Sequence, residues 1–408
     1  MKVLIYAYNY HPEPIGIAPL ITELAEGLVA IGHQVRVITA MPNYPQREIY
    51  PEYRGKLYSS EERNGVVIQR SYVWVRPNPK LLDRVLLDGS FVITSLMQAL
   101  RGWRPDIILY TTPPLPVSVP VALLGWLYRC PTVLNLQDIL PEAAVHVGLL
   151  SNPVLIRVFA TLEWFAYRTS NAIAVIADKF TDNLVGKDVD SAKIRCIANW
   201  VNVDFICPRP KLESQFCQTH KLQEKFVVLY SGNIALTQGL ETVIDTAVEL
   251  KTQPDIQFVI VGEAKALQKL QTYCEQHQVE NVLLLPFQPR AALPDMLAAA
   301  DVGLVVQRRN VISFNLPSKI QVLLACGRPI IASVPQDGAA AQTIANSGGG
   351  LVVNPEDPKA LATAILQLHG DRQKAETLGQ AGRDFALQRF SFERSLQAYE
   401  QLFKDLKN

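Results

Sequence analysis

The stretch from Lys2 to Ala40 reads KVLIYAYNYHPEPIGIAPLITELAEGLVAIGHQVRVITA, and it decides the fold class. It begins with an apolar run at 2–7 that is typical of a buried strand. A loop rich in Pro and Gly follows, and apolar residues then recur at helical spacing at Ile21, Leu24, Ala25 and Leu28. Gly32 is expected to end this helix, and 34–39 is expected to form the next strand. The stretch therefore predicts a β-α-β unit with a loop after its first strand.

The same alternation continues in two successive series. The first has further strands at 106–110, 132–136 and 171–176, and the second has strands at 226–230, 256–261, 282–285, 301–306, 330–333 and 351–354. Regular alternation predicts parallel sheets covered by helices on both faces. We therefore expect an α/β protein with two doubly wound, Rossmann-like domains that face a cleft, where ligands bind at the carboxyl ends of the strands.

The expected domain boundaries follow from a polar linker at 208–225 and from a helical run near the end of the chain. We expect an N-terminal domain over 1–205 and a C-terminal domain over 206–388. A last helix over 389–408 is expected to pack back on the N-terminal domain.

Composition excludes several classes of protein. The 408 residues are 49% hydrophobic and 19% charged, which excludes a mainly disordered chain. Lys and Arg number 39 against 38 Asp and Glu, a net charge of +1, so a general nucleic-acid binder is not expected. None of the six cysteines forms a C-x-x-C pair, which gives no support for a zinc or thiol redox site and suits reduced thiols in the cytosol.

No targeting or membrane-spanning segment is expected. The apolar run at 2–6 is too short for a signal peptide. The longest uncharged stretch, 107–128, contains four prolines, which argue against a spanning helix.

Two loops that follow predicted strands are candidate phosphate sites. The first is 9–16, which ends in Gly16, and the second is Ser231-Gly232-Asn233. Backbone N–H groups and the helix dipole at such a turn suit an anion, and glycine lets the backbone approach a ligand. The alternative for both is an ordinary turn of an α/β fold.

Lys319 is a third candidate, in the segment LPSK at 316–319 before an apolar helix. Pro317 and Ser318 fit a helix start, where a lysine is electrostatically unfavourable. An anionic ligand would resolve the conflict; the alternative is a solvent-exposed lysine.

Asp138 and Glu142 are two carboxylates four residues apart, just beyond a predicted strand. They could bind sugar hydroxyls or assist proton transfer, or they could cap the next helix.

The region 70–104 is basic and aromatic, and 81–99 within it is amphipathic. Such a surface could rest on an anionic bilayer. The alternative is an ordinary amphipathic helix that packs on its own sheet.

Together these segments resemble glycosyltransferase family 4, which has the two-domain GT-B fold, and within it the enzymes of colanic-acid and O-antigen assembly. The matching stretches are spread in order along nearly the whole chain. They are YNYHPE at 8–13, GH at 32–33, MPNYP at 41–45, LQDILPE at 136–142, IANWV at 197–201, YSGN at 230–233, QGL at 238–240, VGE at 261–263, LPSK at 316–319 and ACGRP at 325–329.

The resemblance implies a retaining, metal-independent transfer of a sugar from a nucleotide-sugar donor to a lipid-linked saccharide or glycolipid in cell-surface polysaccharide assembly. No cofactor is implied, because the nucleotide-sugar is a substrate, and UDP is favoured over GDP. The implied location is cytoplasmic, peripheral on the inner face of the plasma membrane, whose surface is a partner.

The resemblance also assigns residues by position. Lys319 and Asp138 are the implied catalytic residues. The implied donor-binding residues are Gly16, Gly232, Asn233, Gly262, Glu263, Phe287, Arg308 and Lys319. The implied acceptor-binding residues are His11, Asp138 and Glu142.

Some positions depart from the family pattern. The family's Glu-x7-Glu pair corresponds to Phe314 and Val322, and cations usually found around the diphosphate correspond to Pro19, Asn233 and Thr237/Gln238. The usual His before the Asp is Gln137. Arg308 and Arg309 are expected to compensate for the missing cations.

Two other functions follow from the same pattern: a non-catalytic GT-B partner subunit, which the missing residues favour, and a nucleotide-sugar 2-epimerase.

Overall fold

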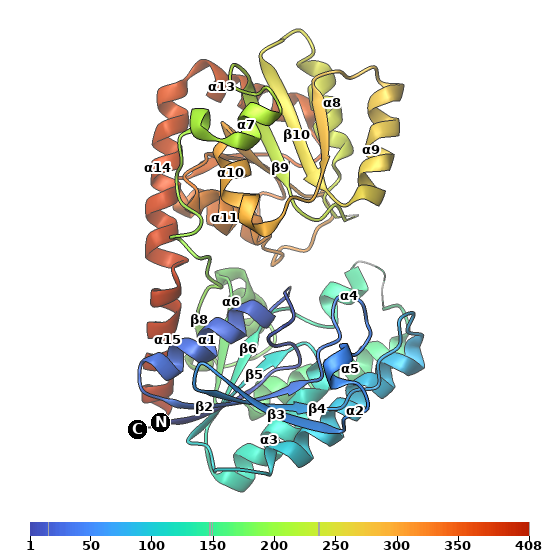
Figure 1. Cartoon of the computed structure of the whole chain (residues 1–408), viewed down its shortest axis with the longest axis vertical. Helices are drawn as coiled ribbons and strands as arrows, with labels where there is room; N and C mark the ends of the chain where they lie inside the picture. The colour runs from blue at the N-terminus through green and yellow to red at the C-terminus, as the bar shows by residue number, and fades with distance from the viewer. Residues whose placement is uncertain (15, 147, 149, 236, 408) are drawn as a thin grey trace. The chain divides into compact units, whose positions relative to one another are not determined.

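The computed structural model describes residues 1–14, 16–146, 148, 150–235 and 237–407. The chain forms two compact units (Figure 1). Unit 1 is Met1–Asn199 together with the C-terminal stretch that begins at Leu396, and unit 2 is Trp200–Ser395. Each unit has its own sheet and its own core.

Unit 1 contains an eight-stranded sheet in the order β3-β4-β2-β1-β5-β6-β7-β8. Its strands are β1 (Lys2–Tyr6), β2 (Gln34–Ala40), β3 (Tyr58–Arg63), β4 (Val66–Ser71), β5 (Ile107–Thr112), β6 (Thr132–Leu136), β7 (Ala172–Val175) and β8 (Ile194–Cys196). Neighbouring strands are parallel, except that β3 and β4 form an antiparallel hairpin at one edge. The central strands β1 and β5 are buried along nearly their whole length, as expected of parallel strands covered on both faces.

The helices of unit 1 come from both ends of the chain. They are α1 (Ala18–Ala30), α2 (Leu81–Ala99), α3 (Ser118–Tyr128), α4 (Glu142–His146), α5 (Pro153–Thr169), α6 (Asp178–Val185) and α15 (Phe392–Lys407). Helix α15 joins unit 1 from Leu396 onward. Its Phe403 is fully buried, and Asn135 Nδ2 of β6 donates a hydrogen bond to Tyr399 Oη (2.7 Å).

A buried arginine fixes the end of α2. The Arg36 side chain extends from β2, and its Nη2 donates to the carbonyl oxygens of Ala99 (3.3 Å) and Trp103 (3.1 Å). These acceptors lie at and just beyond the C-terminal end of α2, where a cation also complements the helix dipole. The contact therefore ties the C-terminal end of α2 to β2, an inner strand of the sheet.

Unit 2 contains a six-stranded, fully parallel sheet in the order β11-β10-β9-β12-β13-β14. Its strands are β9 (Phe226–Ser231), β10 (Ile256–Gly262), β11 (Val282–Pro286), β12 (Val302–Val306), β13 (Ile330–Ser333) and β14 (Gly350–Val353). Its helices are α7 (Gln215–Thr219), α8 (Glu241–Glu249), α9 (Ala264–Gln276), α10 (Leu293–Ala298), α11 (Lys319–Ala325), α12 (Ala339–Ser347), α13 (Pro358–Gly370) and α14 (Arg372–Arg389).

The register of unit 2 gathers several loops at one edge of the sheet. Ser231 pairs with Val261, and Gly262 pairs with Pro286, so β9, β10 and β11 end side by side. One face of these strands packs with α8, α9 and α13 in a core that includes Phe226, Val228 and Phe258. The carboxyl ends of the strands thus carry loops whose positions are set by a rigid, buried scaffold.

The structure confirms the predicted α/β fold with two doubly wound units. The hairpin of β3 and β4 was not predicted, because β3 has the sequence YSSEER, which lacks an apolar face. No helix among the described residues is long and apolar enough to cross a membrane.

Candidate functional site

A cavity of about 320 Å³ lies at the carboxyl end of β9 in unit 2. Its walls come from the ends of β9 and β12, from α10 and from the start of α11. The lining residues are Leu229, Ser231, Gly232, Asn233, Gln238, Leu293, Leu297, Leu304, Pro317, Ser318, Lys319, Val322 and Leu323. Three of the predicted donor-site residues, Gly232, Asn233 and Lys319, are therefore brought together in one cavity.

Lys319 places a buried cation in this cavity. Its Nζ is shielded from solvent and has no hydrogen-bond partner among the residues that the structure describes. The Nζ lies 3.4 Å from the centre of the Tyr230 ring, a cation–π contact. The Tyr230 hydroxyl in turn donates a hydrogen bond to the carbonyl oxygen of Asn233 (2.7 Å). The alternative of a solvent-exposed lysine is thereby excluded.

Burial has a direct electrostatic effect on Lys319. Loss of water around the amine lowers its pKa from 10.5 to about 7. Among the described residues, no carboxylate pairs with the ammonium, and the face of the Tyr230 ring lies against it instead. An anion entering the cavity would supply the missing counter-charge.

Gly232 leaves room for the cation. Its φ is +139°, a value that side chains rarely adopt, and a Cβ there would lie 3.2 Å from Lys319 Nζ. Gly262 is also close, since its Cβ would contact the Ile234 side chain and lie 3.4 Å from the Gly232 carbonyl oxygen. Both glycines therefore allow backbone and side chains to crowd around the end of β9.

The other predicted donor-site residues lie outside the lining of this cavity. Arg308 forms ion pairs with Glu241 (3.0 Å) and Glu356 (3.4 Å). Glu263 is the N-cap residue of α9, and Phe287, which follows β11, is 54% exposed. The register of β9, β10 and β11 nevertheless places 263 and 287 at the same sheet edge as the cavity.

The positions that depart from the family pattern differ in their surroundings. Val322 lines the cavity, so an apolar side chain faces the space beside Lys319. Phe314 is buried. Arg309 is exposed, and its backbone N–H donates to Glu356 (3.3 Å).

The predicted acceptor residues of unit 1 are spread along its sheet edge. Asp138 follows β6, and the residue as a whole is exposed. The chain around its carboxyl nevertheless displaces water from that group, and this desolvation raises its pKa. Glu142 instead pairs with Lys187 (3.0 Å) and accepts from Asn183 (2.9 Å). His11 lies in the loop after β1, with its Nε2 3.3 Å from Arg63 Nη1. Its pKa is lowered, mainly by burial and secondly by the positive charge of Arg63. Gly16 is exposed with φ +70°.

Two further acidic residues of unit 1, Asp88 and Glu13, were not among the predicted site residues. Burial raises the pKa of Asp88, on α2, to about 6. Three residues later Phe91 packs edge-to-face on Tyr8 (5.1 Å). Glu13 is buried in the loop after β1 and accepts from the backbone N–H groups of Asn43 and Tyr44 (both 2.8 Å). Both carboxylates are distant from Asp138 in the sequence, and no sequence motif links them to it.

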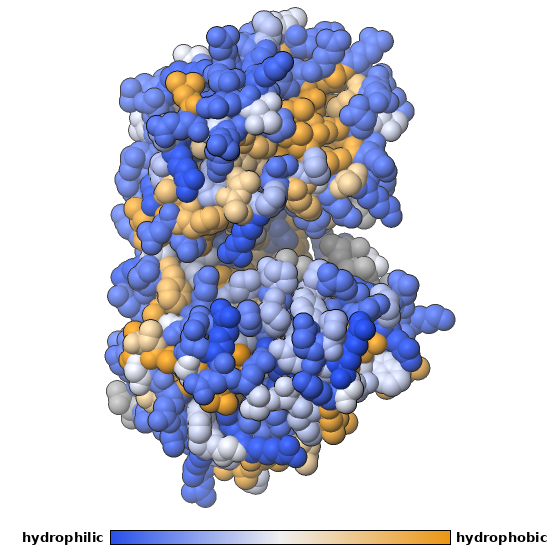
Figure 2. Space-filling model, in the orientation of Figure 1, coloured by the Kyte–Doolittle hydropathy of each residue, from blue (hydrophilic) through white to orange (hydrophobic). Residues whose placement is uncertain are grey.

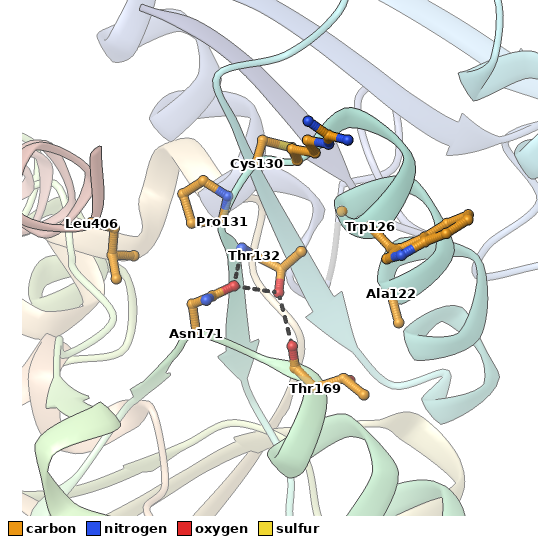
Figure 3. A pocket seen from close by; sticks show the side chains of 10 residues that line it. Ala122, Trp126, Cys130, Pro131, Thr132, Thr169, Asn171 and Leu406 are labelled. Carbon is orange, nitrogen blue, oxygen red and sulfur yellow. Dashed lines mark hydrogen bonds between the residues drawn. The ribbon is translucent and has the colours of Figure 1, made fainter. Parts of the chain in front are cut away.

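Unit 1 also has a second cavity, of about 550 Å³, at the amino end of β6 (Figure 3). Its walls include Ala122 and Trp126 of α3, Thr169 of α5 and Leu406 of α15. Thr132 N donates to Asn171 Oδ1 (2.9 Å). The cavity therefore lies at the amino ends of the strands, whereas the predicted residues of unit 1 follow their carboxyl ends. No predicted site residue lines it.

All six cysteines are free thiols. Within the described ranges, no group of three or more His, Cys, Asp or Glu side chains is arranged to hold a metal ion.

Two family profiles match the chain in succession. The family described as "Glycosyl transferase 4-like domain" matches residues 16–200, and "Glycosyl transferases group 1" matches residues 213–385. The first match falls in unit 1 and the second in unit 2, apart from one residue at the boundary.

Curated relatives extend the match to nearly full length. The chain is 32% identical to "Putative colanic acid biosynthesis glycosyl transferase WcaI" of Escherichia coli (strain K12), over 90% of this chain and 92% of the relative. It is 25% identical to "Probable glycosyltransferase WbjE" of Pseudomonas aeruginosa, over 74% of this chain and 76% of the relative.

Solved structures share the fold at low identity. Anabaena Alr3699/HepE, in a crystal structure with UDP, matches with a TM-score of 0.73 at 18% identity, with 100% of both chains covered. The sucrose-phosphate synthase of Thermosynechococcus elongatus matches with a TM-score of 0.72 at 18% identity, over 100% of this chain and 99% of that one.

Proposed function

The chain belongs to glycosyltransferase family 4 and has the GT-B fold, and on this premise we propose that it is a retaining glycosyltransferase that takes its sugar from a nucleotide-sugar bound in unit 2. The observation that carries the proposal is the buried Nζ of Lys319 in a cavity at the carboxyl end of β9, where no other described residue forms a hydrogen bond with it.

The physical argument rests on the cost of burying a charge. An ammonium that loses water without gaining a counter-ion is destabilising, and in a protein of this class the natural counter-ion is the donor diphosphate. When the sugar leaves, negative charge develops on that diphosphate. A cation already fixed in place stabilises this charge without reorganisation, which is the contribution we assign to Lys319.

The remaining roles follow from position. Gly232 and Asn233 would lie against the phosphates, with Gly262, Glu263 and Phe287 toward the nucleoside. Because the leaving phosphate can itself accept the acceptor proton, retention needs no separate enzymic base. Asp138 of unit 1 would then orient the sugar or the acceptor hydroxyl, and desolvation raises the pKa of its carboxyl. Lys319 supplies the neutralising charge, so we propose that transfer needs no metal.

The substrates are proposed by analogy with relatives. The name of the Escherichia coli relative supports a role in exopolysaccharide assembly, with a lipid-linked saccharide or glycolipid as acceptor and the inner face of the plasma membrane as location. The crystal structure of HepE with UDP supports a UDP-sugar as the first donor to test. Another relative is named as GDP-mannose-dependent, so GDP-mannose belongs in the same panel.

Calorimetry with a panel of UDP-, GDP- and dTDP-sugars tests the donor site. We expect one nucleotide class to bind, and Lys319→Met to weaken that binding at least about tenfold, as removal of a charge-assisted contact should. Lys269→Met on α9 removes an exposed lysine of the same unit and serves as the matched control. No binding to the wild-type protein, or equal binding by the Lys319 variant, would contradict the proposal.

A non-catalytic partner subunit is the second candidate. It is favoured by Val322, an apolar side chain that lines the cavity where the family has an acid. Donor binding without sugar release to any lipid-linked acceptor, together with stimulation of a second transferase, would favour this function over catalysis.

A further inference from the structure

Three helices of unit 1 expose most of the large apolar side chains that the described part of the chain presents to solvent. They are α2, α3 and α5, and α3 packs against both of the others. Part of this apolar surface is visible as orange patches along the lower edge of Figure 2, over α2 and α3. We call the outer side of these three helices the α2–α3–α5 face.

Helix α3 is the most unusual member of the face. Its sequence, SVPVALLGWLY, has no charged residue, yet Leu123 and Trp126 are exposed, Trp126 by 77%. On α5, Val158 and Trp164 are also exposed, Trp164 by 59%. An apolar area of this extent on one side of a domain marks an interaction surface rather than ordinary scatter.

The exposed charges of the face are basic. Arg84 of α2 and Arg157 and Arg168 of α5 are all exposed. None of the three acidic residues of these helices is fully exposed: Asp83 accepts from the Lys80 N–H (3.0 Å), Asp88 is half-buried, and Glu163 is buried and paired with Lys187 (2.8 Å). Arg168 also lies over the Trp164 ring (5.9 Å), so a cation and an indole share one spot.

We propose that the α2–α3–α5 face docks on an anionic lipid bilayer. Exposed indoles and aliphatic side chains enter the boundary between headgroups and acyl chains, and the arginines bind lipid phosphates at the rim. A second copy of the chain fits less well, because a two-fold contact would bring the same arginines together. The inference deepens the proposed function, since a lipid-linked acceptor lies in such a bilayer, but the face is argued from unit 1 alone.

Vesicle co-sedimentation tests the face directly. The wild-type protein is expected to bind vesicles of phosphatidylglycerol mixed with phosphatidylcholine, more weakly at high salt, and to bind phosphatidylcholine vesicles much less. Arg157→Glu with Arg168→Glu should lower binding at least about tenfold. Leu123→Ser with Trp126→Ser should lower it by a similar factor even at low salt.

Matched variants in unit 2 serve as controls. Leu212→Ser removes an equally exposed apolar side chain, and Lys251→Glu reverses an exposed charge. Both should bind vesicles as the wild type does. Far-UV circular dichroism and donor calorimetry on every variant verify that the fold and the donor site are intact.

Several results would overturn the inference. They are no binding of the wild type to anionic vesicles, unchanged binding by both face variants, or equal losses in the controls. Self-association that Leu123→Ser with Trp126→Ser abolishes, without vesicle binding, would assign the face to a second copy. Vesicle binding without donor binding would instead contradict the proposed function and leave the face standing.

Discussion

Burial of Lys319 has two opposing effects. It places a cation where we propose that the donor binds, and it lowers the stability of the folded protein. Its amine lies over the Tyr230 ring, no acidic side chain in the described part of the chain pairs with it, and burial lowers its pKa to about 7. A pKa of about 7 places the titration of this amine near neutral pH. A bound diphosphate would favour the ammonium, so binding and protonation are linked.

Replacing the amine should stabilise the protein while removing donor binding. We expect Lys319→Met to raise the free energy of unfolding by ~1–3 kcal/mol at pH 6, because an apolar chain of similar length replaces a buried polar group. The pKa is lower in the folded state than in the unfolded state, so the penalty is full below about pH 7 and is relieved as pH rises toward 10.5. Denaturant unfolding of both proteins between pH 6 and 10 should show their difference shrinking. A difference that does not change with pH would contradict a buried titrating amine.

Tyr230 should position Lys319. We expect Tyr230→Leu to weaken nucleotide-sugar binding about three- to thirtyfold, since a cation–π contact contributes ~0.5–2 kcal/mol. Tyr230→Phe keeps the ring and loses only the hydrogen bond to Asn233, so binding should stay close to wild type.

Calorimetry across pH separates positioning from general damage to the fold. The diphosphate of a nucleotide-sugar has no proton to gain near neutral pH, so proton uptake on binding reports Lys319. The pH at which uptake appears should shift in Tyr230→Leu and not in Tyr230→Phe. Equal behaviour of the two variants would remove the role we assign to the ring.

At the scale of elements, the turn after β9 decides whether the cation has room. Gly232 combines a φ of +139° with a Cβ position 3.2 Å from Lys319 Nζ. We expect Gly232→Ala to cost about 1–3 kcal/mol in stability and to weaken donor binding at least tenfold. Gly370→Ala, at the end of α13, has open space around the new Cβ and no positive φ, so it should be neutral. Melting curves and calorimetry on both variants check this, and similar losses in both would contradict it.

Sequence patterns predicted the helices and strands better than they predicted which residues contact one another. The apolar runs of β1, β5, β9 and β10 are buried on both faces, which is why alternation with helices identified them. The hairpin of β3 and β4 escaped because a charged edge strand has no such pattern. Lys319 was found through its unfavourable place at a helix start, a local signal.

Contacts between distant residues could not be predicted in the same way. Tyr230 and Lys319 are 89 positions apart, and only the fold, which brings the start of α11 to the carboxyl end of β9, joins them. Arg308 forms ion pairs with Glu241 and Glu356, and neither partner is near it in sequence. Its expected role as a replacement for a missing cation stays a prediction. The burial of Asp88 likewise depends on how α2 packs and not on the residues beside it.

At the scale of the whole molecule, α15 completes the core of unit 1 from the far end of the chain. Phe403 is fully buried, and Tyr399 bonds with Asn135 of β6. We expect Phe403→Ala to lower the stability of unit 1 by ~3–5 kcal/mol. Trp74, Trp103, Trp126 and Trp164 lie in unit 1, so tryptophan fluorescence mainly reports its unfolding. A loss confined to unit 2 would contradict this assignment of α15.

The path of the chain through the two units also bears on how the protein is made. Unit 2 is one continuous segment, whereas unit 1 is interrupted by it and receives α15 only after unit 2 has been synthesised. During translation, unit 2 can fold from its own residues, but unit 1 must wait on the ribosome with its binding surface for α15 uncovered. The half of the protein that is translated first is therefore the half that is finished last, and it is the half that we expect chaperones to hold.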